Sequence, residues 1–261
     1  MSKFLAFLRK DIQIALSYKF NLLLQLTLII FIMSLIFLSL VSNNDSGLGN
    51  SDFFKILVGI ALIDFMFSSM SVFSREVRFA QTYGTFEALI LTKTSILTIL
   101  LSSYALTFSR SILRILIYVL ISKLIFGVDI AFSNMPIFLV LVIYNSMPFI
   151  GIGLFAAAFI ILFKVGNVIN FFVAISSIFF SGIFFSLDAM PENFANISNN
   201  LPLTIGLEIA GQALLNTFEL GEAFPNLLKI LFMSFLFVPT GILLVYYSLK
   251  EAKKSGNLNY Y

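Results

Sequence analysis

The residues that could do chemistry in this sequence are few, because it contains neither histidine nor cysteine. Their absence removes the commonest general base, the thiol nucleophile and most zinc ligands. The sequence also lacks a Gly-x-x-x-x-Gly-Lys-Ser/Thr loop, so it has no phosphate cradle of the kind that binds ATP. Its acidic residues are scattered and indicate no metal site. We therefore expect that the chain is not an enzyme and binds no cofactor itself.

Two opposite charges interrupt long apolar segments of the chain. Asp64 lies in the middle of one segment, and Arg114 lies at a similar depth in the next. A charge at the centre of a membrane-spanning helix costs about 2.5–3.5 kcal/mol on insertion scales and normally has a partner. We predict that Asp64 forms an intramembrane ion pair with Arg114, or with Arg110 one turn earlier. A proton or ion relay through Asp64 is the alternative, but relays usually need several ionisable groups in series.

A polar island, residues 74–94 (SREVRFAQTYGTFEALILTKT), lies between two long apolar segments. Its charges could give steering and register to a protein–protein contact, and its aromatic residues are of the types that anchor interfaces. Gly84 supplies a turn or a close approach. Each charge taken alone is better explained as a solvated loop residue, so the cluster carries the prediction. We predict that the island contacts a soluble partner through Arg75, Glu76, Arg78, Phe79, Tyr83, Gly84, Thr85, Phe86 and Glu87.

The composition of the 261-residue chain is that of a membrane protein, with 59% hydrophobic residues, 11% charged residues and a mean hydropathy of +1.02. A helix needs about 20 mostly apolar residues to cross the hydrocarbon core. The uncharged runs are too long for barrel strands and do not alternate, so the spans are α-helical. We predict a single all-α transmembrane domain, 1–261, with six spans at approximately 22–41, 53–73, 107–126, 136–163, 168–187 and 227–248.

Three further elements are expected around these spans. Residues 1–20 place apolar side chains on one face, which is typical of an amphipathic helix in the membrane interface. The segment 95–128 would be ~51 Å long as a helix, so it should continue below the membrane. In the loop 188–226, residues 203–215 are apolar but too short to span. They predict short re-entrant helices that dip into the outer leaflet or cap it, with a surface helix as the alternative.

Lysine and arginine set the orientation of the spans. The predicted loops 42–52, 129–135 and 188–226 contain neither residue. The opposite side collects most of the basic residues: Lys3, Arg9, Lys10, Lys19, Arg75, Arg78, Lys93, Lys164, Lys250, Lys253 and Lys254. We therefore expect an integral membrane protein whose termini and polar island (74–94) are all cytoplasmic.

Two groups of motifs resemble the permease subunit of a type-2 ATP-binding cassette (ABC) exporter. In the island, where that family has its coupling helix, the chain reads Arg75-Glu76-x-Arg78 and then Tyr83-Gly84-Thr85-Phe86-Glu87-Ala88-Leu89. Further on it reads Ser181-Gly182-Ile183-Phe184-Phe185, Met190-Pro191, Ile197-Ser198 and Leu201-Pro202-Leu203-Thr204. The resemblance extends over essentially the whole chain. It departs at Thr92-Lys93-Thr94, where members often have proline, and at Gln212, where they often have arginine.

The resemblance implies a dimeric permease in a prokaryotic plasma (inner) membrane. Its partners would be a second copy or a related permease chain, the lipid bilayer and separate ATPase subunits that bind ATP and magnesium, with no nucleic acid. The second and fifth spans would line the translocation path. Taken singly, each residue of these spans is better explained by helix packing. The candidates for substrate contact are Phe65, Phe67, Ser68, Ser71, Phe172, Ser176, Phe179, Phe180 and Phe184.

The nature of the path and the class of transporter are open at this point. A Phe-rich, nearly uncharged path favours an apolar or amphipathic substrate over a polysaccharide or glycolipid. A secondary transporter or channel would need ionisable or unwound sites at mid-membrane, and only Asp64 and Pro148 point that way. A membrane enzyme acting on lipid would need a catalytic constellation, which we do not find in the sequence.

Overall fold

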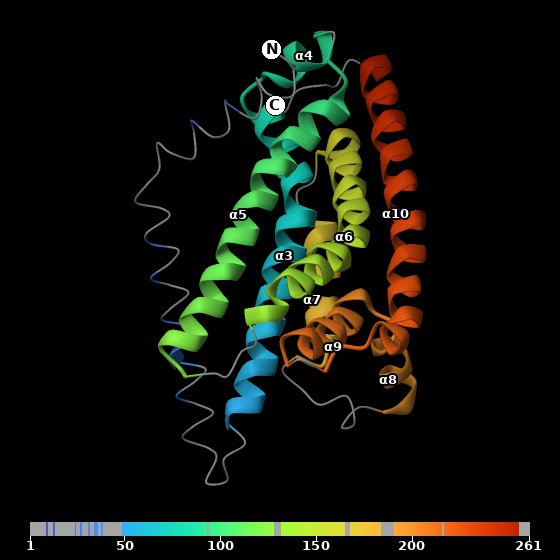
Figure 1. Ribbon diagram of the computed structural model, residues 1–261. Helices are drawn as coiled ribbons and strands as arrows, with labels where there is room; N and C mark the ends of the chain where they lie inside the picture. Colours follow the sequence, from blue (N-terminus) through green and yellow to red (C-terminus); the bar gives the residue numbers. More distant parts are fainter. Residues whose placement is uncertain are drawn as a thin grey trace.

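The computed structural model describes residues 49–92, 94–127, 132–164, 168–183, 191–215 and 217–255, and a few single positions before residue 49. These ranges are helical apart from short turns, and they contain no strand. Figure 1 shows the helices, which are α3 (Gly49–Thr82), α4 (Phe86–Leu91), α5 (Ile96–Leu124), the 3₁₀ helix η1 (Phe132–Asn134), α6 (Met135–Phe163), α7 (Val168–Phe180), α8 (Glu192–Ser198), α9 (Pro202–Leu214) and α10 (Leu220–Ser255). The predicted amphipathic helix at 1–20 and the predicted span 22–41 lie outside the described ranges.

Among the described residues, four helices are long and apolar enough to cross a membrane: α3, α5, η1 with α6, and α10. They confirm the all-helical membrane class, and they correspond to the predicted spans 53–73, 107–126, 136–163 and 227–248. One of them extends beyond its predicted bounds at the island, and another begins where the sequence predicted a helix longer than its span. The helix α3 continues past residue 73 to Thr82, because charged residues do not by themselves end a helix. The helix α5 begins at Ile96, so the apolar segment after the island is one helix from its start.

The fifth predicted span, 168–187, is corrected by the structure. The helix α7 ends at Phe180 and is only ~20 Å long, which is less than the ~30 Å of a hydrocarbon core. The chain turns at Gly182, whose φ of 72° suits a residue without a side chain. Ser181 fixes this turn: its hydroxyl donates to the Ile178 carbonyl at 2.8 Å and accepts from the Ile183 amide at 3.3 Å.

The helix α6 lies between α3 and α10 and packs closely against both (Figure 1). Gly153 rests on the backbone of α3, where an added Cβ would lie 2.6 Å from the Met70 carbonyl oxygen. Gly151 rests on the backbone of Phe237 in α10, and Gly241 of α10 rests in turn on the Gly151 carbonyl. Small residues at these positions allow the main chains to touch, as is common between membrane helices. The helix α6 is therefore the central helix of the described part of the chain.

The helix α9 is buried against α6 and α3 and is not a surface helix. Gly206 packs against the side-chain amide of Asn145, which is itself only 2% exposed. The Thr204 hydroxyl donates to the Phe180 carbonyl at 3.3 Å, which joins α9 to the end of α7. Of the two possibilities for the loop 188–226, the structure favours short helices built into the protein.

Candidate functional site

The polar island and the carboxyl end of α10 lie at the same end of the molecule, and α8 and α9 lie at the other (Figure 1). Leu89 and Ile90 of α4 line one hollow together with Leu249 and Lys250 of α10. The charge asymmetry predicts that the island and the C-terminal segment lie on the cytoplasmic side of the membrane, and that orientation stays a prediction.

The island consists of two helices joined by a glycine turn. The helix α3 ends at Thr82, and Gly84 turns the chain with a φ of 67°. Thr85 then starts α4, and its amide donates to the Ala80 carbonyl at 2.9 Å. The side chain of Ser95 caps the next helix by accepting from the Thr98 amide at 3.4 Å. The island therefore joins α3 and α5 through α4 and two short turns.

The nine residues predicted to contact a partner are divided between these elements. Arg75, Glu76, Arg78 and Phe79 lie on the last turns of α3, Tyr83, Gly84 and Thr85 form the turn, and Phe86 and Glu87 begin α4. Eight of them are exposed or partly exposed in the chain. The exception is Phe86, which is 1% exposed and packs in a core cluster with residues such as Phe73, Leu154 and Val245. Phe86 thus anchors α4 to the spans instead of offering surface to a partner.

One face of α3 at the island carries a hollow of about 450 Å³. Two arginines and two aromatic residues are among its lining side chains, and the rings of Phe79 and Tyr83 stack with centroids 6.1 Å apart. Guanidinium groups beside aromatic faces suit an anionic or protein partner. The lining residues are Ser71, Arg75, Arg78, Phe79, Thr82 and Tyr83.

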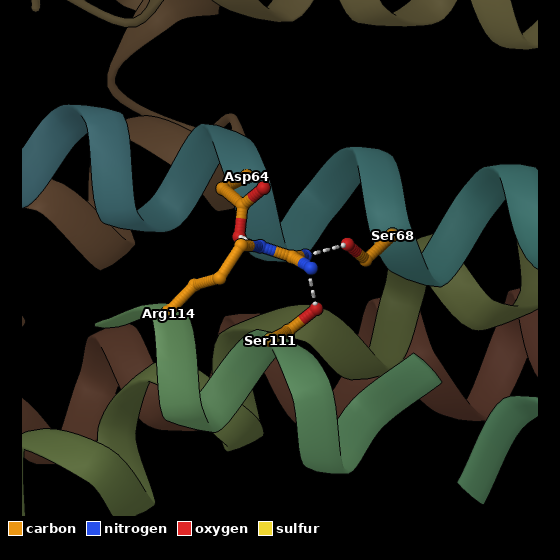
Figure 2. Close-up of polar contacts among 4 residues, drawn as sticks. All are labelled: Asp64, Ser68, Ser111 and Arg114. Carbon is orange, nitrogen blue, oxygen red and sulfur yellow. Dashed lines mark hydrogen bonds and ion pairs between the residues drawn. The ribbon is translucent and has the colours of Figure 1, made fainter. Parts of the chain in front are cut away.

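The structure brings Asp64 of α3 together with Arg114 of α5, as Figure 2 shows. The Arg114 Nε donates to Asp64 Oδ2 at 2.9 Å. The same guanidinium donates through Nη2 to the hydroxyl oxygens of Ser68 at 2.9 Å and Ser111 at 2.8 Å. Both charged side chains are about three-quarters buried in the chain, at 24% and 23% exposure. The arrangement pairs the carboxylate and occupies three of the five guanidinium N–H groups.

Ser111 was not singled out in the sequence, although its position one turn before Arg114 makes it a natural acceptor. Ser68 was predicted as a path residue, and the structure gives it a second role as a partner of Arg114. Arg110, the alternative partner for Asp64, lies one turn from Arg114 on α5. The geometry of Figure 2 therefore favours the structural ion pair over a relay, because the single carboxylate is held by a fixed cation.

The predicted path residues fall into three groups. Phe67 and Ser71 of α3, and Phe172, Ser176 and Phe179 of α7, are exposed or partly exposed along their helices. Of the described path residues, Phe65 faces the protein interior: it is 2% exposed and meets Phe108 of α5 edge to face at 5.4 Å. Ser68 and Phe180 are partly exposed, and the Phe180 ring stacks on Phe194 of α8 at 6.0 Å. Phe184 lies outside the described residues.

A polar junction between α3 and α7 was missed in the sequence. The Asn170 side-chain amide donates to the Met70 carbonyl at 3.2 Å and to the Ser74 hydroxyl at 2.9 Å. Asn170 is 5% exposed and Ser74 is fully buried. An asparagine within an uncharged, Phe-rich helix was the available signal, because such amides often join membrane helices.

The comparisons with known proteins agree with this architecture. No protein with curated annotation matches the sequence. The family model described as ABC-2 type transporter matches residues 2–215, which is more than half of the chain. The match includes the polar island, the Asp64–Arg114 pair and the buried helix α9. The chain therefore belongs to the ABC-2 type transporter family, of which it is a transmembrane component.

Proposed function

We propose that this chain is the permease subunit of an ATP-driven exporter. It works as a dimer, with a second copy or a related permease chain, and with separate ATPase subunits that bind ATP and magnesium. Family membership supports the association with an ABC ATPase.

The observation that carries the proposal is the packing of α4 against the membrane-spanning helices and its short connections to two of them. Phe86 at its start is buried among residues of α3, α5, α6 and α10. Single short turns join α4 to α3 and α5, each of which is long enough to cross a membrane. A displacement of α4 by a partner would therefore be transmitted directly to two spans, since close-packed contacts do not deform gradually.

The exposed residues around α4 supply a surface on which an ATPase subunit could dock. Glu87 is exposed in the first turn of α4, while Arg78 and Tyr83 are exposed beside it. Opposite charges can fix the relative position of two partners at an interface, and an aromatic ring can be buried there as an anchor. In the proposed orientation this surface, and both termini of the chain, are cytoplasmic.

The exposed faces of α3 and α7 are the proposed walls of the translocation path. Phe67 is 42% exposed, and Phe172 and Phe179 are 64% and 54% exposed, while hydroxyl groups of Ser71 and Ser176 lie among them. Phenylalanine with occasional hydroxyl groups favours an apolar or amphipathic substrate, such as a lipid, a lipopeptide or a drug-like molecule. A charged or strongly hydrated substrate would find few polar partners there.

The test is to purify the tagged full-length chain from its native host and identify the proteins that accompany it. We expect a P-loop ATPase to co-purify, and ATP-dependent movement of a lipid-like probe after reconstitution of both proteins into vesicles. Vesicles with the ATPase omitted, and vesicles with a non-hydrolysable ATP analogue, are the controls. Transport that persists without the ATPase would overturn the proposal.

A further inference from the structure

A second hollow, of about 340 Å³, lies between α4, the start of α5 and the last turns of α10. Its inner wall is apolar, since Ile96 and Leu249 are each 8% exposed and belong to the core cluster that also holds Phe86. Its polar groups are hydroxyl and ammonium groups. The lining residues are Leu89, Ile90, Thr94, Ser95, Ile96, Tyr246, Leu249, Lys250 and Lys253.

The charged side chains that line this hollow are all positive. Lys250 and Lys253 both line it, and no lining residue is acidic. On a helix, Tyr246, Lys250 and Lys253 share one face because residues three and four apart are neighbours. Lys254 does not line the hollow, and its Nζ lies 3.7 Å from Glu251 Oε2. Two cations beside hydroxyl groups form a site for an anionic group.

The hollow lies beside an exposed apolar surface of α10. Leu243 and Tyr247 of α10 are 67% and 61% exposed, and Tyr246, which lines the hollow, is 47% exposed. Along α10 only 22% of its most apolar stretch is buried, so most of this stretch is exposed in the single chain and is available to lipid. Tyrosines between an apolar stretch and a lysine cluster are typical of the membrane–water interface. A ligand can therefore reach the hollow from the bilayer as well as from water.

We propose that this hollow binds one anionic phospholipid of the cytoplasmic leaflet. Its phosphate lies between Lys250 and Lys253, and its acyl chain follows the exposed face of α10. The leaflet rests on the orientation given under the proposed function. The bound lipid bridges α10 and α4 through the Leu89 and Ile90 wall, so anionic lipid supports the position of the coupling helix. An acidic segment of the ATPase is the competing occupant, and lateral access from lipid favours the phospholipid.

The test measures lipid binding to the purified full-length chain in detergent by native mass spectrometry. Dioleoylphosphatidylglycerol is titrated against dioleoylphosphatidylcholine, which has the same acyl chains and no net charge. The matched variants are Lys253→Gln and Lys254→Gln, which remove the same charge from neighbouring exposed positions of α10. One basic residue near an anionic lipid surface contributes about fivefold in affinity. We expect Lys253→Gln to weaken phosphatidylglycerol binding about fivefold, the Lys250→Gln/Lys253→Gln variant about 25-fold, and Lys254→Gln to bind as the unmodified chain does.

Three results would overturn the proposal. Equal losses in Lys253→Gln and Lys254→Gln would show a diffuse charge effect without a site. Competition by glycerol phosphate, which has no acyl chain, would show that a soluble anion is the ligand. Release of a co-purified ATPase by Lys250→Gln/Lys253→Gln, with phosphatidylglycerol binding intact, would assign the lysines to the protein partner. The first two results are measured on the chain alone, so they do not depend on whether an ATPase is found.

Discussion

The side-chain amide of Asn170 donates to the Ser74 hydroxyl at 2.9 Å and so joins α7 to α3 next to the polar island. The Ser74 hydroxyl donates in turn to the Ser71 carbonyl at 3.1 Å, which completes a short buried chain of hydrogen bonds. This junction connects the two helices whose exposed faces we propose as the walls of the path. It lies one residue from Arg75, the first charged residue of the island.

Replacement of Asn170 by alanine should destabilise the protein, because it removes two interhelical hydrogen bonds. Such bonds in membrane proteins contribute about 0.6 kcal/mol on average and up to about 1.7 kcal/mol, so we expect a loss near the upper value. Thermal unfolding of the purified chain in detergent measures it. Asn200→Ala is the matched control, since Asn200 is exposed and its side-chain amide donates to the Asn196 carbonyl one turn away. Equal melting temperatures for the two variants would contradict the assigned role of Asn170.

The Asp64–Arg114 pair can be tested by a double-mutant cycle. Asp64→Asn and Arg114→Gln should each reduce stability, and the double variant should be no worse than the worse single variant. Contacting residues of this kind show coupling energies of about 0.5–3 kcal/mol. A parallel cycle of Asp64→Asn with Arg110→Gln should show the smaller coupling, because the ion pair joins Asp64 to Arg114. Additive losses in the first cycle would rule out the pair as an energetic unit.

Gly84 should be sensitive to substitution for reasons of backbone conformation alone. An added Cβ meets no atom within 4 Å, but the φ of 67° costs an ordinary residue about 1–2 kcal/mol. Gly211 in α9 is the matched control, since its added Cβ also meets nothing within 4 Å and a helix favours alanine over glycine. We expect Gly84→Ala to lower the melting temperature and Gly211→Ala to leave it unchanged or raise it. The reverse order would contradict the turn at the island.

Reversing a charge at the island should uncouple ATP hydrolysis from transport while leaving membrane insertion intact. The variants are Glu87→Lys and Arg78→Glu, both at exposed positions. Glu192→Lys is the control, because Glu192 is also an exposed first-turn glutamate of a short helix, but in α8 at the opposite end. Vesicles that contain the permease and its ATPase report both rates. Full coupling in the two island variants, or equal uncoupling by Glu192→Lys, would argue against α4 as the contact.

The parts of this structure that could be predicted are those set by local chemistry. The Asp64–Arg114 pair follows from the cost of a lone charge in hydrocarbon and from the depth of the two residues along their helices. The glycine turn at residue 84 follows from residue type. What could not be predicted depends on neighbouring helices. Phe65 was predicted to line the path and Phe86 to contact a partner, yet both are buried by side chains far away in the chain.

The bounds of the helices were the less predictable feature of the fold. A run of apolar residues indicates that a segment is buried in lipid or protein, but not where its helix ends. Ser181 and Gly182 were recognised as a motif and not as a turn, so the early end of α7 was missed. Asn170 was missed for a related reason, since a single amide gives no periodic signal. Its importance appears only when Met70 and Ser74 are placed opposite it.

The direct contact between the main chains of α6 and α10 has a mechanical consequence. At Gly151 and Gly241 the main chains of the two helices touch, so sliding or separation would break close backbone contacts. Any such movement would open a void between the helices, and voids in protein interiors are destabilising. We therefore expect α6 and α10 to rotate or tilt as one rigid body during a transport cycle. The conformational change should then occur mainly at the shorter α7 and at its hydrogen bonds to α3.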